Sequence, residues 1–295
     1  MSFEKEKRGR MREFDKKLLK NLYKPADNSS GEDNGQITII GGSKLFHGAP
    51  LFSLKVASRI VDMVFFTSPD PSTGRVAERL KSKLLSFIWI PWEDIDKYVE
   101  KSDAVLIGPG FMRFGRERRP HFARASRGRQ VSFDETGSLT RSITEKLLKK
   151  FPDKKWVIDA GSLQTMDADW IPKNAILTPN RKEFGILFGN IMPQDAAKKY
   201  YCVIVLKGIE TIVCSPNQSV VVKGGNAGLT KGGTGDVQAG LTVALLAKND
   251  PFLAASGAAY IIKAAADDLY KKVGTNYNAD DLADAVPLFF PHKMR

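Results

Sequence analysis

Short apolar runs rich in β-branched residues alternate with helical stretches over the first two thirds of the chain, and this alternation constrains the fold most strongly. Strands separated by helices need crossover connections, which favour a mainly parallel sheet. We therefore expect an α/β fold whose sheet is covered by helices on both faces, with helices at 49–60 and 74–85 among them. The apolar runs predict buried strands at residues 37–40, 61–67, 87–90, 104–107, 156–158 and 175–177.

The last third of the chain changes pattern. Apolar runs at 203–206, 211–214 and 219–222 leave no room for helices between them, which predicts an antiparallel extension at one edge of the sheet. No interdomain linker is evident, and the polar stretch 27–35 leads into a core that we expect to begin near Gln36. We therefore divide the chain into a basic N-terminal extension and one domain, over residues 1–35 and 36–295. Three helices are expected near its end, at 237–247, 251–272 and 279–285.

The formal net charge of +12 is concentrated in two segments. Residues 1–24 carry a net charge of +5 and residues 111–129 a net charge of +6, which leaves about +1 for the rest of the chain. We interpret the second segment as an Arg-rich insertion at about 111–135. Each segment is compatible with binding of RNA or membrane phosphates, although we favour solvated segments. The insertion is also compatible with a clamp on a substrate phosphate.

Composition argues against several classes of protein. No run of about 18 apolar residues occurs, so we predict no membrane span. The charged N-terminus lacks the apolar core of a signal peptide, which predicts a cytoplasmic protein. Cys202 and Cys214 lie in apolar strand-like runs, so we expect buried thiols in a reducing compartment. No group of Cys and His has the spacing of a zinc site.

Glycines and polar residues follow four of the predicted strands. Each turn by itself is typical of an ordinary tight connection, so only their agreement at one edge of the sheet is informative. Ligands of such sheets bind at the carboxyl ends of the strands, which predicts a site there. The four turns are Gly41-Gly42-Ser43, Gly108-Pro109-Gly110, Asp159-Ala160-Gly161 and Thr178-Pro179-Asn180, the last followed by Glu183.

The stretch GLTKGGTGDVQAG, residues 228–240, joins a glycine-rich turn to the start of a predicted helix. The unpaired N–H groups and the dipole at such a helix start attract anions. Gly233 and Gly235 would let the backbone approach a phosphate, and Thr234 would add a hydroxyl. Asp236 is compatible with a proton-accepting base and with an ordinary helix cap. The stretch lacks the Gly-Lys-Ser/Thr ending of a P-loop.

Together, six ordered motifs resemble the ADP/ATP-dependent NAD(P)H-hydrate dehydratases, a family of the ribokinase-like superfamily. The resemblance covers residues 25–287, nearly the whole chain. It implies a ribokinase-like three-layer α/β/α sandwich, and an enzyme that repairs hydrated NADH and NADPH with ADP or ATP driving the loss of water. The motifs are IIGGSKLFHGAPLFS (39–53), VLIGPG (105–110), VIDAGSLQ (157–164), ILTPNRKEF (176–184), VIVLKGIETIV (203–213) and GLTKGGTGDVQAG.

The resemblance also implies roles for individual residues. Asp236 matches the catalytic base, which deprotonates the ring hydroxyl for attack on the terminal phosphate before elimination restores the reduced ring. Backbone N–H groups of Gly233, Thr234 and Gly235 match the anion hole for the transferred phosphoryl group. The positions that match the nucleotide site are Lys207, Gly208, Thr211 and Gly235. Those that match or adjoin the substrate site are Ser43, Ala49, Gly108, Gly110, Asn180 and Asp236.

The sequence departs from the common family pattern at several positions. Asn180 stands where His is usual, the polar segment 28–31 stands where His-Lys-Gly is common, and Gly161 replaces a frequent Asp. Asn180 with Glu183 instead matches the Asn-x-x-Glu element of sugar and vitamin kinases, in which the Glu organises Mg²⁺ and its waters. Glu183 is therefore a candidate contact of Mg²⁺ through water, and a kinase of a small hydroxylated metabolite remains an alternative.

Further expectations concern partners. Residues 1–35 are too short for a companion epimerase domain, so the other epimer of the substrate would convert spontaneously or on another protein. Members of the family often assemble, which leaves a homo-oligomer open. The basic segments leave open a second alternative, a non-catalytic nucleotide- or RNA-binding protein. The sequence does not separate ADP from ATP as donor, or hydrated NADH from hydrated NADPH as substrate.

Overall fold

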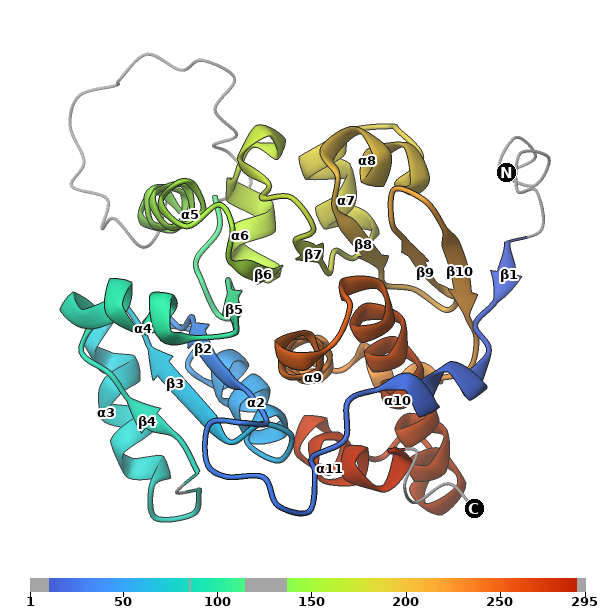
Figure 1. Ribbon diagram of the computed structural model, residues 1–295, viewed down its shortest axis with the longest axis horizontal. Coiled ribbons are helices and arrows are strands. Elements are labelled where there is room, and N and C mark those ends of the chain that lie inside the picture. Colours follow the sequence, from blue (N-terminus) through green and yellow to red (C-terminus); the bar gives the residue numbers. More distant parts are fainter. Residues whose placement is uncertain (1–10, 85, 115–136, 291–295) are drawn as a thin grey trace.

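In the computed structural model, which describes residues 11–84, 86–114 and 137–290, ten strands form one mixed sheet (Figure 1). The strands run in the order β1-β10-β9-β8-β7-β6-β5-β2-β3-β4. Their bounds are β1 Arg12–Glu13, β2 Gln36–Ile40, β3 Met63–Thr67, β4 Ile88–Trp89, β5 Ala104–Ile107, β6 Lys155–Ile158, β7 Ile176–Leu177, β8 Val203–Leu206, β9 Thr211–Cys214 and β10 Ser219–Val222.

The sheet has the predicted parallel body and antiparallel edge. Strands β4, β3, β2, β5, β6, β7 and β8 are all paired in parallel. Strand β9 is antiparallel to both β8 and β10, because only short turns join these three strands. The expected mainly parallel α/β fold with an antiparallel extension is therefore confirmed.

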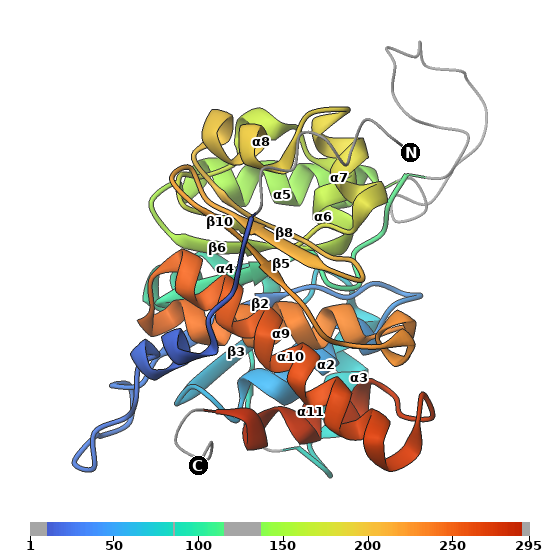
Figure 2. The same cartoon turned by 90° about the vertical axis from the view of Figure 1, so that its right-hand side faces the viewer.

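Helices cover both faces of the sheet (Figure 2). The α-helices are α2 Gly48–Ala57, α3 Pro71–Leu80, α4 Ile95–Lys101, α5 Ser138–Lys150, α6 Ala160–Thr165, α7 Arg181–Phe188, α8 Pro193–Tyr200, α9 Thr234–Lys248, α10 Pro251–Val273 and α11 Ala279–Ala285. Short 3₁₀ helices lie at Lys16–Asn21, Trp92–Asp94, Ala168–Trp170, Ala227–Thr230 and Val286–Phe289.

The continuous apolar runs of the strands result from this double cover. Val105 and Ile107 of β5 face the core beneath α4–α8, whereas Leu106 faces the core beneath α2, α9 and α10. Successive side chains of a strand point to opposite faces, so a strand covered on both faces needs apolar residues at every position. The three-layer arrangement expected for the chain is thus confirmed.

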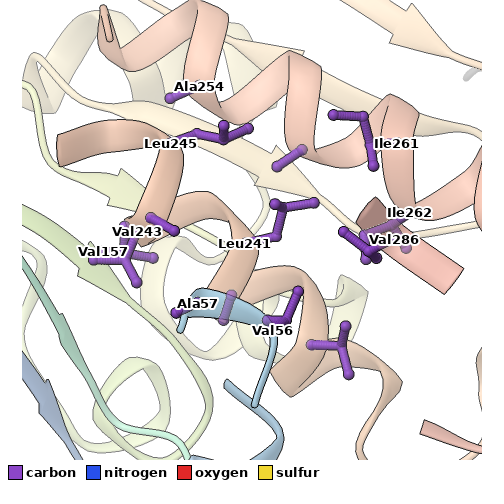
Figure 3. Packing of buried hydrophobic residues seen from close by; sticks show 14 of the residues in the cluster. Val56, Ala57, Val157, Leu241, Val243, Leu245, Ala254, Ile261, Ile262 and Val286 are labelled. Atoms are coloured by element: carbon purple, nitrogen blue, oxygen red, sulfur yellow. The ribbon is translucent and has the colours of Figure 1, made fainter. Parts of the chain in front are cut away.

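Helix α9 lies at the centre of one layer and is apolar on all sides. Every residue from Val237 to Ala247 is buried, as expected of a helix that contacts the sheet and neighbouring helices at once. Figure 3 shows Leu241 and Val243 of α9 beside Val56 and Ala57 of α2. Gly240 permits this close approach, since a Cβ atom there would lie 2.4 Å from the Cα atom of Ser53 in α2.

The packed chain begins before Gln36, contrary to our expectation for the core. Strand β1 pairs in parallel with β10 at the edge of the sheet. Phe14, Leu19 and Leu22 are buried in the core beneath α10. A two-residue strand is too short to show a hydrophobic period, and the basic composition of the segment favoured a solvated one. The sequence therefore contained no indication of these contacts.

The sequence also predicted buried cysteines, no membrane span and an Arg-rich insertion. Cys202 and Cys214 are free and buried, as predicted. None of the helices in the described part of the chain combines the length and apolar character that a membrane crossing needs. Most of the Arg-rich insertion, residues 115–136, lies outside the described residues.

The Gly240→Ala substitution should destabilise the protein. The added methyl group would collide with the backbone of Ser53, and such overpacking costs about 1–3 kcal/mol. This outweighs the helix preference of Ala over Gly, which is about 1 kcal/mol. Urea unfolding monitored by circular dichroism measures the change in the free energy of unfolding.

Gly185→Ala provides the matched control. Gly185 lies inside α7, and a Cβ atom there would have no atom within 4 Å. Its substitution should therefore raise the free energy of unfolding by up to about 1 kcal/mol. An equal rise in the free energy of unfolding for both variants would contradict the close contact between α2 and α9 at Gly240.

Candidate active site

Three polar side chains meet where neighbouring parallel strands end. Asp159 follows β6, Thr178 follows β7 and Lys207 follows β8. The Lys207 Nζ atom donates to Asp159 Oδ1 over 3.0 Å, and the Thr178 hydroxyl donates to the same oxygen over 2.7 Å. The Asp159 residue is only 1% exposed, whereas the Lys207 side chain is 20% exposed, so the pair is buried at its carboxylate and accessible at its ammonium. The parallel order of the strands therefore creates a fixed, buried charge pair at the predicted edge.

The side chain of Lys207, which follows β8, also reaches the start of α9. A Cβ atom on Gly235 would lie 3.4 Å from Lys207 Nζ, which places the ammonium beside the first turn of the helix. Burial alone would lower the pKa of Lys207, but the carboxylates of Asp159 and Glu183 outweigh burial and raise it. Lys207 therefore stays cationic and adds positive charge where the helix dipole is also positive.

Asp236, in the first turn of α9, has an unusual affinity for protons. Burial and the nearby Asp159 carboxylate raise the pKa of Asp236 to about 7, while Lys207 opposes this rise. The Ser53 hydroxyl donates to the backbone oxygen of Asp236 over 2.7 Å, so α2 fixes the position of this turn. A carboxylate with a pKa near neutrality is suited to accept a proton during catalysis.

The glycine-rich turn before Asp236 has one packed side and one open side. Gly233 has a φ angle of +91°, and a Cβ atom there would lie 2.5 Å from the ring of Phe52. At Gly232 a Cβ atom would meet nothing within 4 Å. The ring of Phe52 therefore packs against one side of the glycine-rich turn, while the backbone of the turn stays accessible to a ligand on the other side.

The Thr234 hydroxyl does not have the free position that we expected. It lies 2.7 Å from the carbonyl oxygen of Leu229 and 2.8 Å from that of Lys231, and it is buried. Its single proton is therefore used to hold the loop. The Thr234 N–H also donates to the Lys231 carbonyl over 3.4 Å, so the Gly235 N–H is the next group of the first turn that could bind an anion.

Asn180 and Glu183 form a capping box at the start of α7. Asn180 Oδ1 accepts a hydrogen bond from the Glu183 N–H over 3.0 Å, and Glu183 Oε2 accepts one from the Asn180 N–H over 2.8 Å. Gln164 Nε2 donates to Glu183 Oε1 over 3.1 Å. Burial raises the pKa of Glu183, and Asp159 adds to the rise against the opposing effect of Lys207. The Asn-x-x-Glu spacing therefore has a structural role here.

Four of the residues predicted for the substrate site lie at or beside the ends of β2 and β5, namely Ser43, Ala49, Gly108 and Gly110. The Gly42 N–H donates to the Pro109 carbonyl over 2.8 Å, which joins the two turns. Gly108 and Gly110 have φ angles of +117° and +72°, and Cβ atoms there would collide with backbone oxygens. Ser43 is buried, with no partner for its hydroxyl among the described residues. Ala49 lies in the first turn of the adjoining helix α2.

The predicted nucleotide segment borders a cavity of about 930 Å³. Lys207 and Gly208 line it from the turn between β8 and β9, while Thr211 is buried at the start of β9. Phe184 and Met192, from the α7–α8 side, contribute apolar surface. A cavity of this size leaves room for a nucleotide-sized ligand beside the turn.

Sequence reasoning placed Asp159 in one of the turns at the predicted ligand edge but gave it no role of its own. Its signal was present, because it follows the buried run 156–158 directly and so lies at the carboxyl end of a strand. Within residues 11–84, 86–114 and 137–290, no three His, Cys, Asp or Glu side chains are grouped so as to hold a metal ion.

The raised pKa of Asp236 predicts a pH-dependent gain of stability for Asp236→Asn. The native carboxyl binds a proton more tightly than in the unfolded chain, where its pKa is 3.8. The wild type therefore loses stability as the pH rises from 3.8 to about 7, whereas the amide does not titrate. Each pKa unit corresponds to about 1.4 kcal/mol, so the advantage of the variant should grow by up to about 4 kcal/mol.

Urea unfolding of both proteins at pH 4 and pH 8 measures this difference. The control is Asp153→Asn, which removes an exposed carboxylate and should leave the pH profile unchanged. Parallel stability profiles for wild type and Asp236→Asn would contradict the assigned proton affinity.

Comparison with known proteins identifies the family. The family model described as NAD(P)H-hydrate dehydratase matches residues 37–288. A bifunctional NAD(P)H-hydrate repair enzyme Nnr from Archaeoglobus fulgidus is 32% identical over 280 residues, which cover 90% of this chain and 53% of the relative. The chain thus spans about half the length of the bifunctional relative. An ADP-dependent (S)-NAD(P)H-hydrate dehydratase from Cenarchaeum symbiosum is 28% identical, with 88% of this chain and 90% of the relative covered.

The solved structures agree on the fold. A ribokinase-like superfamily protein from Enterococcus faecalis V583 superposes with a TM-score of 0.75 at 20% identity, with 96% of each chain covered. This similarity confirms the expected ribokinase-like fold. Because the family model covers most of the chain, the protein belongs to the NAD(P)H-hydrate dehydratase family.

Proposed function

We propose that this protein dehydrates hydrated NADH or NADPH at the expense of ADP or ATP. The observation that carries the proposal is the position of Asp236, a carboxyl with a pKa of about 7 in the first turn of α9 beside the Lys207 ammonium. Membership of the family and the ADP-dependent relative from Cenarchaeum symbiosum support the same activity. The site thus combines a base with positive charge at an anion-binding helix start.

Asp236 would take the proton from the ring hydroxyl of the hydrated cofactor. The hydroxyl oxygen then attacks the terminal phosphorus of the nucleotide, and the bond to the bridging oxygen breaks, releasing AMP from ADP or ADP from ATP. The N–H groups of Gly233 and Gly235 and the Lys207 ammonium would bear the charge of the transferred phosphoryl group. The C–O bond to the phosphate then breaks while the adjacent ring carbon loses a proton to solvent, so that inorganic phosphate leaves and the ring double bond of the reduced nicotinamide is restored.

Mg²⁺ fits this site only as an ion held mainly by the nucleotide. Both Glu183 oxygens already accept hydrogen bonds, from Asn180 and Gln164, yet each keeps a further lone pair for a metal-bound water. The Mg²⁺ ion commonly uses few protein ligands together with phosphates and waters. When bound, it would neutralise phosphate charge, with Glu183 contacting its waters.

The alternative kinase function loses part of its support. Asn180 and Glu183 favoured it in the sequence, but their capping box explains the spacing without catalysis. A kinase would leave a stable phosphorylated product, whereas a dehydratase releases inorganic phosphate with the repaired cofactor. The fate of the phosphate therefore separates the two functions.

Purified protein with hydrated NADH, Mg²⁺ and either ADP or ATP should restore the absorbance of reduced nicotinamide and release one phosphate for each cofactor repaired. Parallel reactions with hydrated NADPH give the substrate preference. Reactions without nucleotide are the control. No recovery of absorbance with either nucleotide would rule out the proposed activity.

Asp236→Asn should abolish turnover and spare nucleotide binding. Removal of a general base costs about 10²- to 10⁴-fold in rate, because the ring hydroxyl keeps its proton. Nucleotide affinity, measured by calorimetry, should stay near that of the wild type. The Asp153→Asn variant should keep full activity, and an active Asp236→Asn enzyme would contradict the assigned base.

The rate of the wild type should depend on pH through the same carboxyl. Only the deprotonated form of Asp236 accepts a proton, so kcat/KM should rise as the pH increases through about 7. Initial rates at saturating nucleotide between pH 5 and pH 9, after correction for substrate stability, report this profile. A flat profile below pH 7 would count against Asp236 as the base.

A further inference from the structure

One buried lysine of α10 connects two turns that are far apart in the sequence. Lys263 is 5% exposed, and its Nζ atom donates to backbone oxygens on both turns. The acceptors are Ile209 at 2.6 Å and Gly208 at 3.4 Å in the turn after β8, and Gly224 at 2.7 Å in the turn after β10. The three N–H bonds of the ammonium are thereby matched by three carbonyls.

The two turns belong to the two halves of the candidate site. Residues 207–211 form the predicted nucleotide segment. The turn at Gly224 leads through residues 226–233 into the anion-binding start of α9. Asp267, one helical turn beyond Lys263, accepts a hydrogen bond from the Gly225 N–H over 3.0 Å, which holds the second turn to the same helix. The pairing of Val222 with Thr211 between β10 and β9 already brings the two turns together, and α10 holds both of them from one side.

The three carbonyls that Lys263 binds belong to residues at the surface of the protein. Residues Gly208, Ile209 and Gly224 are exposed, so water could satisfy their carbonyls if the lysine were absent. Burial lowers the pKa of Lys263, and the carboxylates of Asp267 and Glu210 offset this only in part. No carboxylate in the described part of the chain forms an ion pair with it.

We propose that Lys263 is a positioning residue for the nucleotide, an inference that rests on the proposed function. It fixes the turn at Gly208 and Ile209 against the turn at Gly224 before the nucleotide binds. The nucleotide then meets a preformed segment and need not order it, which favours affinity. Lys263 acts through backbone carbonyls, so it should affect nucleotide binding and leave the chemical step at Asp236 unchanged.

Lys263→Met tests this role, because it keeps the length of the side chain and removes the ammonium. Calorimetric titration of the full chain with ADP and with ATP should show Kd raised about tenfold, equivalent to about 1.4 kcal/mol. The kcat at saturating nucleotide should change by less than about twofold, since an effect on binding alone leaves turnover intact. Thermal denaturation of the same samples checks that the variant is folded.

Two further variants complete the test. Lys271→Met removes an exposed lysine of the same helix and should leave nucleotide affinity unchanged. Lys263→Arg keeps a cationic donor and should retain most of the affinity that Lys263→Met loses, which also provides a measurement if the Met variant does not fold.

The outcomes separate this inference from the proposed function. Folded Lys263→Met with wild-type affinity would overturn the positioning role alone, and so would a fall in kcat without a change in Kd. Loss of folding in both Lys263 variants would make the lysine a structural group and overturn the role as well. A wild-type protein that binds neither ADP nor ATP would defeat the proposed function and this inference together.

Discussion

The buried ion pair between Lys207 and Asp159 is the interaction on which the candidate site depends. It joins the ends of β8 and β6, and Thr178 at the end of β7 donates to the same carboxylate oxygen. A buried ion pair is useful only when its members are also hydrogen-bonded, since the loss of water around each charge is costly. Here the parallel order of three adjacent strands supplies both the pairing and the hydrogen bond.

The same pair controls the proton affinity of Asp236. Asp159 and burial favour the protonated form, whereas the Lys207 ammonium favours the charged form. Because Asp159 already pairs with Lys207, the attraction of the lysine does not fully offset the burial of Asp236. The result is a carboxyl that titrates near neutral pH at the start of a helix, where an anionic substrate group would also bind.

Rigid packing keeps this balance of charges in place. Helix α9 is buried on all sides, Gly240 allows α2 to approach it, and the Ser53 hydroxyl fixes the Asp236 backbone.

Much of the sheet was predictable, because strands covered on both faces leave continuous apolar runs in the sequence. Strand β1 was not predictable, because two polar residues at a sheet edge carry no such pattern. Asn180 stays a prediction for the substrate site, and the structure adds that its side-chain oxygen caps α7.

The sequence by itself determined the order of the strands along the chain, the glycine-rich turns at their ends and the identity of Asp236 and Lys207. Local backbone requirements decide the strands and the turns, so these leave a local signal, whereas Asp236 and Lys207 were singled out by the resemblance of their motifs to a family. Only the tertiary structure decided that Lys207 pairs with Asp159, 48 residues away, and that Lys263 joins turns 54 and 39 residues distant. Burial and Coulomb interaction depend on distance in space, and that distance is set only once the sheet and its helices have packed.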